Sequence, residues 1–135
     1  MRITIEAFQS ETAVTTDWAQ LRPEVTPALL DQIVQRIVAR FHPHRIVLFG
    51  SYAYGQLTLD SDLDLLVLMD SDEPMFPRIR KVSAVAEVPF LPIDIIVRTP
   101  EEMAERTAMG DPFMREVMTR GVVLYDNSRR VDRQG

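Results

Sequence analysis

The chain has 135 residues, and 46% of them are hydrophobic, which suffices for one domain with a buried core but not for two. It contains no cysteine, which excludes disulfide bonds, thiolate metal sites and cysteine nucleophiles. The formal net charge of −5 argues against broad binding to a nucleic-acid backbone, because such binding relies on many lysine and arginine contacts. We expect one domain over residues 26–125, preceded by a polar arm (1–25) and followed by a flexible polar tail (126–135).

No segment of the sequence is typical of membrane insertion or secretion. The longest apolar run, Leu63 to Met69, is interrupted by Asp64 and is far shorter than the roughly 20 residues of a membrane-spanning helix. The first residues alternate between polar and apolar types and lack the basic region and apolar block of a secretory signal. We therefore expect a cytoplasmic protein that does not bind membranes.

The first elements of the domain are a helix and a buried strand. Residues Thr26 to Phe41 carry apolar side chains at intervals of three and four, which predicts an amphipathic helix capped by Thr26, with Pro27 at its first position. Arg45 to Phe49 reads as a buried strand rich in branched residues. Gly50 ends this strand, and a short helix is expected from Ser51.

The remaining pattern alternates strands and helices. The predicted elements are a strand at Leu63 to Met69, a helix at Met75 to Val88, a strand at Ile93 to Val97, helices that start at Thr99-Pro100 and Asp111-Pro112, and a last strand at Val122 to Tyr125. Such alternation favours an α/β sheet in two or three layers over a helical bundle or a β-sandwich.

The stretch from residue 50 to residue 67 resembles two common motifs but matches neither. A phosphate-binding P-loop needs a lysine after its second glycine, and Gln56 follows Gly55 here. The acidic run from Asp60 to Asp64 imitates a calcium-binding EF-hand loop, but Leu65 stands at the position that requires glycine. Both interpretations are therefore rejected.

Three carboxylates in and beside the predicted strands form a candidate metal site. Asp62 and Asp64 lie two residues apart on one strand, so their side chains point to the same face. Asp94 lies within an apolar strand, where a buried charge is costly unless it is paired. If the two strands are neighbours, the three oxygen donors suit Mg²⁺ ions, and two such ions can clamp an in-line displacement at phosphorus.

Gly50 and Ser51 are candidates for phosphate binding. A helix that starts at Ser51 directs free backbone amides and the positive end of its dipole beyond the strand. Glycine permits close approach of a ligand, and the serine hydroxyl adds a donor. The sequence thus combines a metal site, a phosphate cradle and a candidate base.

Gly50-Ser51, then ten residues, then Asp62-Leu63-Asp64, with Asp94 later in an apolar strand, resembles the nucleotidyltransferases of the DNA polymerase β superfamily. Its short length makes the chain similar to the minimal nucleotidyltransferases, the MntA-type antitoxins encoded beside HEPN-domain toxins. The resemblance covers roughly residues 33–125 and implies the polymerase β-like nucleotidyltransferase fold, a small mixed sheet flanked by helices. Many relatives carry an arginine in the turn after Gly-Ser, where this chain has Tyr52 and Tyr54.

The resemblance also implies a role for each site residue. Asp62 and Asp64 would bind both metals, Asp94 would bind the catalytic metal and help deprotonate the attacking hydroxyl, and Gly50 and Ser51 would hold phosphates. ATP would donate AMP to a hydroxyl, expected to be a tyrosine of a HEPN toxin that is thereby neutralised. Two alternatives stay open: an antitoxin that masks its toxin without catalysis, and an enzyme that modifies small molecules such as aminoglycosides. The sequence also leaves open whether the chain forms homo-oligomers or hetero-oligomers.

Other polar residues are given structural interpretations. Arg78, Arg80 and Lys81 are expected on the solvated face of their helix. His42 and His44 flank a proline between a helix and a strand, which is typical of a surface loop. None of the five is assigned to the site.

Overall fold

The structure is a computed structural model that describes residues 21–58 and 61–128. Most of the expected N-terminal arm, the residues of the tail from 129 onward, and Asp60 lie outside the described residues. The elements in chain order are α3 (Pro27–Phe41), β1 (Arg45–Phe49), α4 (Ser51–Tyr54), β2 (Leu63–Leu68), α5 (Met75–Ala86), β3 (Ile93–Arg98), α6 (Pro100–Ala108), α7 (Pro112–Arg120) and β4 (Val122–Asp126).

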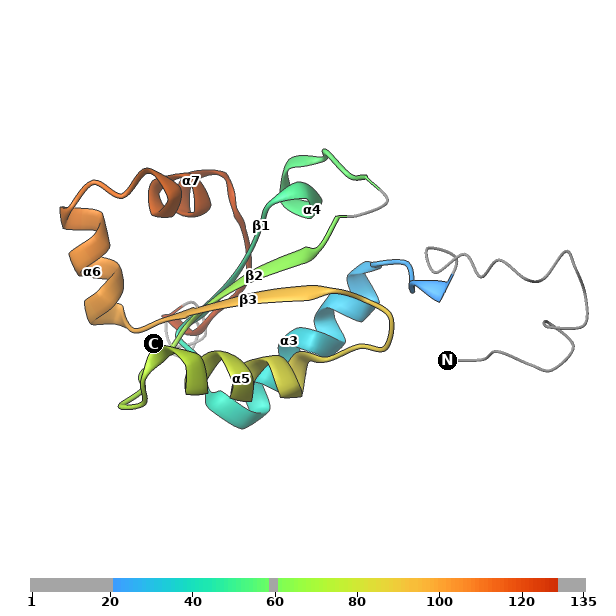
Figure 1. Ribbon diagram of the computed structural model, residues 1–135, viewed down its shortest axis with the longest axis horizontal. Helices are drawn as coiled ribbons and strands as arrows, with labels where there is room; N and C mark the ends of the chain where they lie inside the picture. Colours follow the sequence, from blue (N-terminus) through green and yellow to red (C-terminus); the bar gives the residue numbers. More distant parts are fainter. Residues whose placement is uncertain (1–20, 59–60, 129–135) are drawn as a thin grey trace, which may run out of the picture.

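The four strands form one mixed sheet in the order β3-β2-β1-β4 (Figure 1). β1 pairs with β2 and with β4 in the antiparallel sense, whereas β2 and β3 are parallel. The parallel pair is joined by α5, as a crossover between parallel strands requires. The expected α/β architecture with a small mixed sheet flanked by helices is confirmed.

Local capping signals set most helix boundaries as predicted. The Thr26 hydroxyl accepts a hydrogen bond from the Leu29 amide at 3.1 Å, and Thr99 forms a complete capping box with Glu102. α5 ends two residues earlier than predicted, because Val88 pairs with Leu91 in an isolated bridge. Pro89 also disfavours the helical conformation of Val88, the residue before it, which contributes to the early end of the helix.

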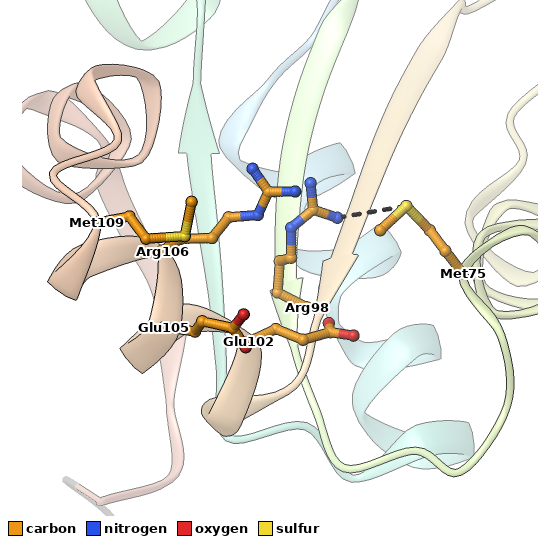
Figure 2. A pocket seen from close by; sticks show the side chains of 6 residues that line it. All are labelled: Met75, Arg98, Glu102, Glu105, Arg106 and Met109. Carbon is orange, nitrogen blue, oxygen red and sulfur yellow. Dashed lines mark hydrogen bonds between the residues drawn. The ribbon is translucent and has the colours of Figure 1, made fainter.

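One face of the sheet is covered by α6 and α7. The buried residues between these helices and the sheet are Val47, Phe49, Leu66, Met103, Met114 and Val117. α6 begins directly after β3, so its side chains lie beside the end of that strand (Figure 2). This face carries residues 64, 66 and 68 of β2 and residues 94, 96 and 98 of β3, because side chains alternate along a strand.

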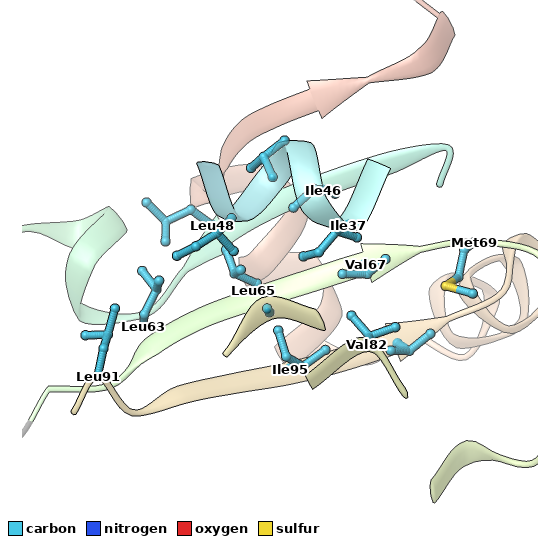
Figure 3. Close-up of a cluster of buried hydrophobic side chains, with 14 residues drawn as sticks. Ile37, Ile46, Leu48, Leu63, Leu65, Val67, Met69, Val82, Leu91 and Ile95 are labelled. Atoms are coloured by element: carbon cyan, nitrogen blue, oxygen red, sulfur yellow. The ribbon is translucent and has the colours of Figure 1, made fainter. Parts of the chain in front are cut away.

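The opposite face of the sheet carries the larger core, under α3 and α5 (Figure 3). Fully buried members include Ile33, Ile37, Leu65, Val67 and Val82. With helices on both faces, the domain has three layers. None of the helices in residues 21–58 and 61–128 is long and apolar enough to cross a membrane.

Candidate active site

The two aspartates of β2 and β3 lie directly beside each other. The parallel register pairs Asp64 with Asp94, and β1 places Phe49 on the other side of Asp64. Asp62 lies immediately before β2, two residues from Asp64. The structure therefore confirms the neighbouring strands on which the three-carboxylate hypothesis depended.

Asp94 is more exposed than the sequence predicted. The sequence predicted a costly charge inside a buried strand, but Asp94 and Asp62 are both exposed, and Asp64 is partly buried. The reason is that along β3 the contacts of the α6 and α7 face begin beyond Asp94, at Ile96. Two of the three carboxylates, those of Asp62 and Asp94, are thus open to solvent at this end of the sheet.

The electrostatics of the site centre on Asp64. Burial, followed by the charges of Asp94 and then Asp62, raises the pKa of Asp64 from 3.8 to about 6. Burial and the two neighbouring charges both disfavour the ionised carboxylate of Asp64, and a bound cation would favour it. The donor set consists only of carboxylate oxygens, which fits Mg²⁺.

The three side chains do not form a complete metal cage. Among the described residues, no group of three or more His, Cys, Asp or Glu side chains is arranged to hold a metal ion. Asp62 and Asp94 are exposed, so both are free to change rotamer without repacking the core. Metal binding at this site would therefore involve rotation of these two side chains toward Asp64.

Gly50 is required by the position of Asp64. Its backbone has φ 74° and ψ −156°, a conformation that only glycine adopts readily. A Cβ at residue 50 would lie 2.1 Å from Oδ2 of Asp64, which is an impossible contact. The absence of a side chain at residue 50 thus lets the carboxylate of β2 pack against the turn that opens α4.

α4 supplies the expected short helix at Ser51, but it spans only four residues. The Ala53 and Tyr54 amides both donate to the Gly50 carbonyl at 3.0 Å, and the amides of Ser51 and Tyr52 precede the first helical bonds. One turn of helix has only a small dipole, so the predicted dipole contribution is corrected to a minor one. Phosphate binding at this turn would therefore depend on these amides and on the Ser51 hydroxyl.

Arg22 connects the turn at α4 with the segment before Asp62, a role that the sequence did not indicate. Its Nη2 donates to the Tyr52 hydroxyl at 3.3 Å and also to the Ser61 carbonyl. Ser61 is buried, and its hydroxyl accepts from the Thr58 amide at 2.8 Å. Arg22 thereby ties α4 to the loop that leads into Asp62.

A second arginine approaches the turn from α7. The Arg120 guanidinium lies 4.1 Å from the ring centroid of Tyr54, a cation–π contact. Tyr52 and Tyr54 are therefore each in contact with an arginine from elsewhere in the chain. These contacts join residues 30 or more positions apart, so no local pattern could have indicated them.

Comparison with protein families identifies the domain. A model of the nucleotidyltransferase domain matches residues 30–121, which include the sheet up to β3, α4 and all five candidate site residues. The chain belongs to the nucleotidyltransferase domain family. The matched residues include the Gly50-Ser51 turn that lies against Asp64.

A solved structure agrees with this nucleotidyltransferase assignment. The chain is similar to a protein from Sulfolobus solfataricus described as a candidate nucleotidyltransferase, with a TM-score of 0.56 and 20% identity. The similarity covers 84% of this chain and 92% of that one. At this identity the likeness shows the fold. None of the curated proteins matches the chain significantly.

The remaining polar residues of this nucleotidyltransferase lie away from the carboxylates. Nε2 of His44 lies 3.1 Å from a carboxylate oxygen of Asp70, and His42 ends α3, in agreement with a surface loop. The prediction for Arg78 was wrong. Its side chain is only 8% exposed and makes two hydrogen bonds to Glu102, at 2.7 and 2.9 Å. The ion pair with a residue on another helix makes burial of this charge tolerable.

Proposed function

We propose that this nucleotidyltransferase transfers AMP from ATP to a hydroxyl group of a protein, with Mg²⁺ bound at Asp62, Asp64 and Asp94. The observation that carries the proposal is the packing of Asp64 beside Asp94, across from the Gly50-Ser51 turn. A pure binding protein has no evident use for three like charges in this arrangement. When bound, magnesium would neutralise phosphate charge and stabilise the attacking and leaving oxygens.

The chain's own residues divide the remaining work. Ser51 and the first amides of α4 donate hydrogen bonds to the phosphate oxygens of ATP. Asp94 accepts the proton of the acceptor hydroxyl, whose oxygen then forms a bond to the α-phosphorus. The bond from the α-phosphorus to the bridging oxygen breaks, and pyrophosphate leaves. Arg22 and Arg120 contribute positive charge beside α4, where the triphosphate is expected.

For the acceptor, we propose a tyrosine of a HEPN-domain toxin, which AMP transfer would inactivate. Two features support a protein acceptor over a small molecule. Asp62 and Asp94 are exposed at an open end of the sheet, so a side chain on a large partner can reach them. The resemblance of the Gly-Ser and Asp-x-Asp spacing to the minimal nucleotidyltransferases supports the toxin as the specific partner.

A thermal unfolding experiment tests metal-dependent nucleotide binding. A ligand that binds only the folded state raises the melting temperature, so Mg²⁺ with ATP should stabilise the domain more than ATP or Mg²⁺ alone. The Asp64→Asn variant is the matched control and should lose the additional increment. Equal melting temperatures with and without metal, at saturating ATP, would contradict the proposed site.

A further inference from the structure

A second charged pocket lies between α5, β3 and α6, with a volume of about 250 Å³ (Figure 2). Its lining residues are Met75, Arg98, Glu102, Glu105, Arg106 and Met109. Arg98 follows Asp94 by four residues on the same face of β3, which places it about 13 Å further along the strand. The pocket is therefore separate from the carboxylates of the active site.

Arg98 forms no ion pair with any residue in the described part of the chain, although the charges of Glu102 and Asp111 act on it from a distance. Its Nη1 donates to the Val97 carbonyl at 3.1 Å and to Sδ of Met75 at 3.7 Å, and neither acceptor is charged. Its Nε is buried and has no hydrogen-bond partner within residues 21–58 and 61–128. Burial, followed by the charge of Arg106, lowers the pKa of Arg98. A buried donor without a partner is uncommon in proteins and calls for a physical explanation.

Glu102, one of the two acidic residues that line the pocket, is engaged elsewhere. Glu102 binds Arg78 through both carboxylate oxygens and also accepts from the Thr99 amide at 3.0 Å. Arg106 is paired with Asp111 at 3.1 Å, outside the pocket lining. In Figure 2 the guanidinium groups of Arg98 and Arg106 gather at one side, and the carboxylates of Glu102 and Glu105 lie at the other. The two guanidinium groups therefore lie together, and of the two only Arg98 lacks an ion-pair partner among the described residues.

We propose that this pocket binds a small oxyanion, a phosphate or carboxylate group held between the guanidinium groups of Arg98 and Arg106. Guanidinium groups present N–H donors in a planar fork that matches the oxygens of both groups. An anion here would give Arg98 an ion-pair partner and would offset the repulsion between Arg98 and Arg106. Met75 and Met109 form adaptable apolar walls on either flank, and Met109 is 76% exposed at the rim. The proposal does not rest on nucleotidyl transfer.

NMR titration of arginine side chains tests the site directly. Inorganic phosphate and acetate are added separately to the ¹⁵N-labelled protein in chloride buffer, and the Nε–Hε resonances of Arg98 and Arg106 are followed. Saturable shifts of both resonances are expected, and the probe that binds more tightly identifies the oxyanion as phosphate or carboxylate. Loss of a charged hydrogen-bond partner should weaken binding at least about tenfold in Arg98→Met. Arg80→Met removes the same charge from the exposed face of α5 and should leave binding unchanged.

Three results would overturn the proposal. One is the absence of saturable shifts at Arg98 with either anion. Another is a phosphate response confined to the amides of Gly50 and Ser51, which would place phosphate binding only at the active site. The third is equal weakening by Arg98→Met and Arg80→Met, which indicates screening by bulk charge. Arg106→Gln alters a half-exposed side chain, so it provides a second folded variant that should also weaken binding.

Discussion

The carboxylate of Asp64 occupies the space that a side chain at residue 50 would fill, with Oδ2 only 2.1 Å from the position of a Cβ at Gly50. Gly50→Ala should therefore both strain the backbone, at about 1–3 kcal/mol, and displace Asp64. We expect a lower melting temperature and loss of the stabilisation by Mg²⁺ with ATP.

Gly55→Ala is the matched control for Gly50→Ala. Gly55 also has a positive φ of 76°, but a Cβ there meets no atom within 4 Å. Gly55→Ala should therefore destabilise the fold by about 1 kcal/mol and leave the stabilisation by Mg²⁺ with ATP intact. If both variants lose that response equally, backbone strain alone accounts for the effect, and the contact with Asp64 has no special role.

The raised pKa of Asp64 predicts a pH dependence of stability without metal. A folded-state pKa of about 6, above the ordinary 3.8, means that the folded chain holds this proton more tightly than the unfolded chain. The contribution of Asp64 to stability is therefore complete below pH 4 and is lost as the pH rises through 6. Chemical denaturation in the presence of a chelator measures this dependence.

The comparison with Asp64→Asn isolates this contribution from other titrating groups. The hydrogen-bonded Arg78 lowers the pKa of Glu102, so that carboxylate contributes stability that is lost as the pH falls, which is the opposite direction. The variant should be more stable than the wild type at pH 7 and should lose less stability between pH 4 and 7. Parallel curves for the two proteins would show that Asp64 titrates normally.

The sequence was informative where the determining contacts are local. The capping box at Thr99, the proline starts of α3 and α7, and the strand at Leu63 all follow from neighbouring residues, and the structure confirms them. The pairing of Asp64 with Asp94 was predicted only on condition that the strands are neighbours. The parallel register meets that condition.

The features that the sequence missed depend on contacts between distant residues. Arg78 resembles its exposed neighbours Arg80 and Lys81, and only the position of Glu102, 24 residues later, makes it a buried residue. Arg22 reaches Ser61 across 39 residues. Asp94 was expected to be buried because its strand is apolar, whereas its exposure depends on where α6 and α7 cover the sheet.

Removal of Arg78 should destabilise the domain. Arg78→Met leaves Glu102, which is one-third exposed, without its partner, and we expect a loss of about 2 kcal/mol in the free energy of unfolding. Arg80→Met, on the same helix but exposed, should change it by less than about 0.5 kcal/mol. Denaturant unfolding of both variants makes the comparison. A smaller effect for Arg78→Met than for Arg80→Met would contradict the structural role.

The roles proposed for Asp94 and Ser51 predict different kinetic defects. Asp94→Asn should retain nucleotide binding and lose most of kcat, because it removes the proton acceptor. Ser51→Ala should raise KM for ATP with a smaller loss of kcat, as expected when a contact to the bound substrate is removed. Steady-state transfer assays with varied ATP distinguish the two. Identical defects in both variants would remove the basis for this division.

The central claim, transfer of a nucleotide to a partner protein, is tested most directly by intact-mass analysis of the partner with the Asp62→Asn/Asp64→Asn double variant as control. Asparagine keeps the side-chain volume but removes two charges, so the double variant should fold. Either version of the chain is co-expressed with a HEPN-domain partner, growth is recorded, and the intact mass of the purified partner is measured. We predict an AMP-sized mass increase and rescued growth with the wild type, and neither with the double variant. Full rescue by the double variant, with no mass increase in either case, would contradict catalysis and indicate masking by binding.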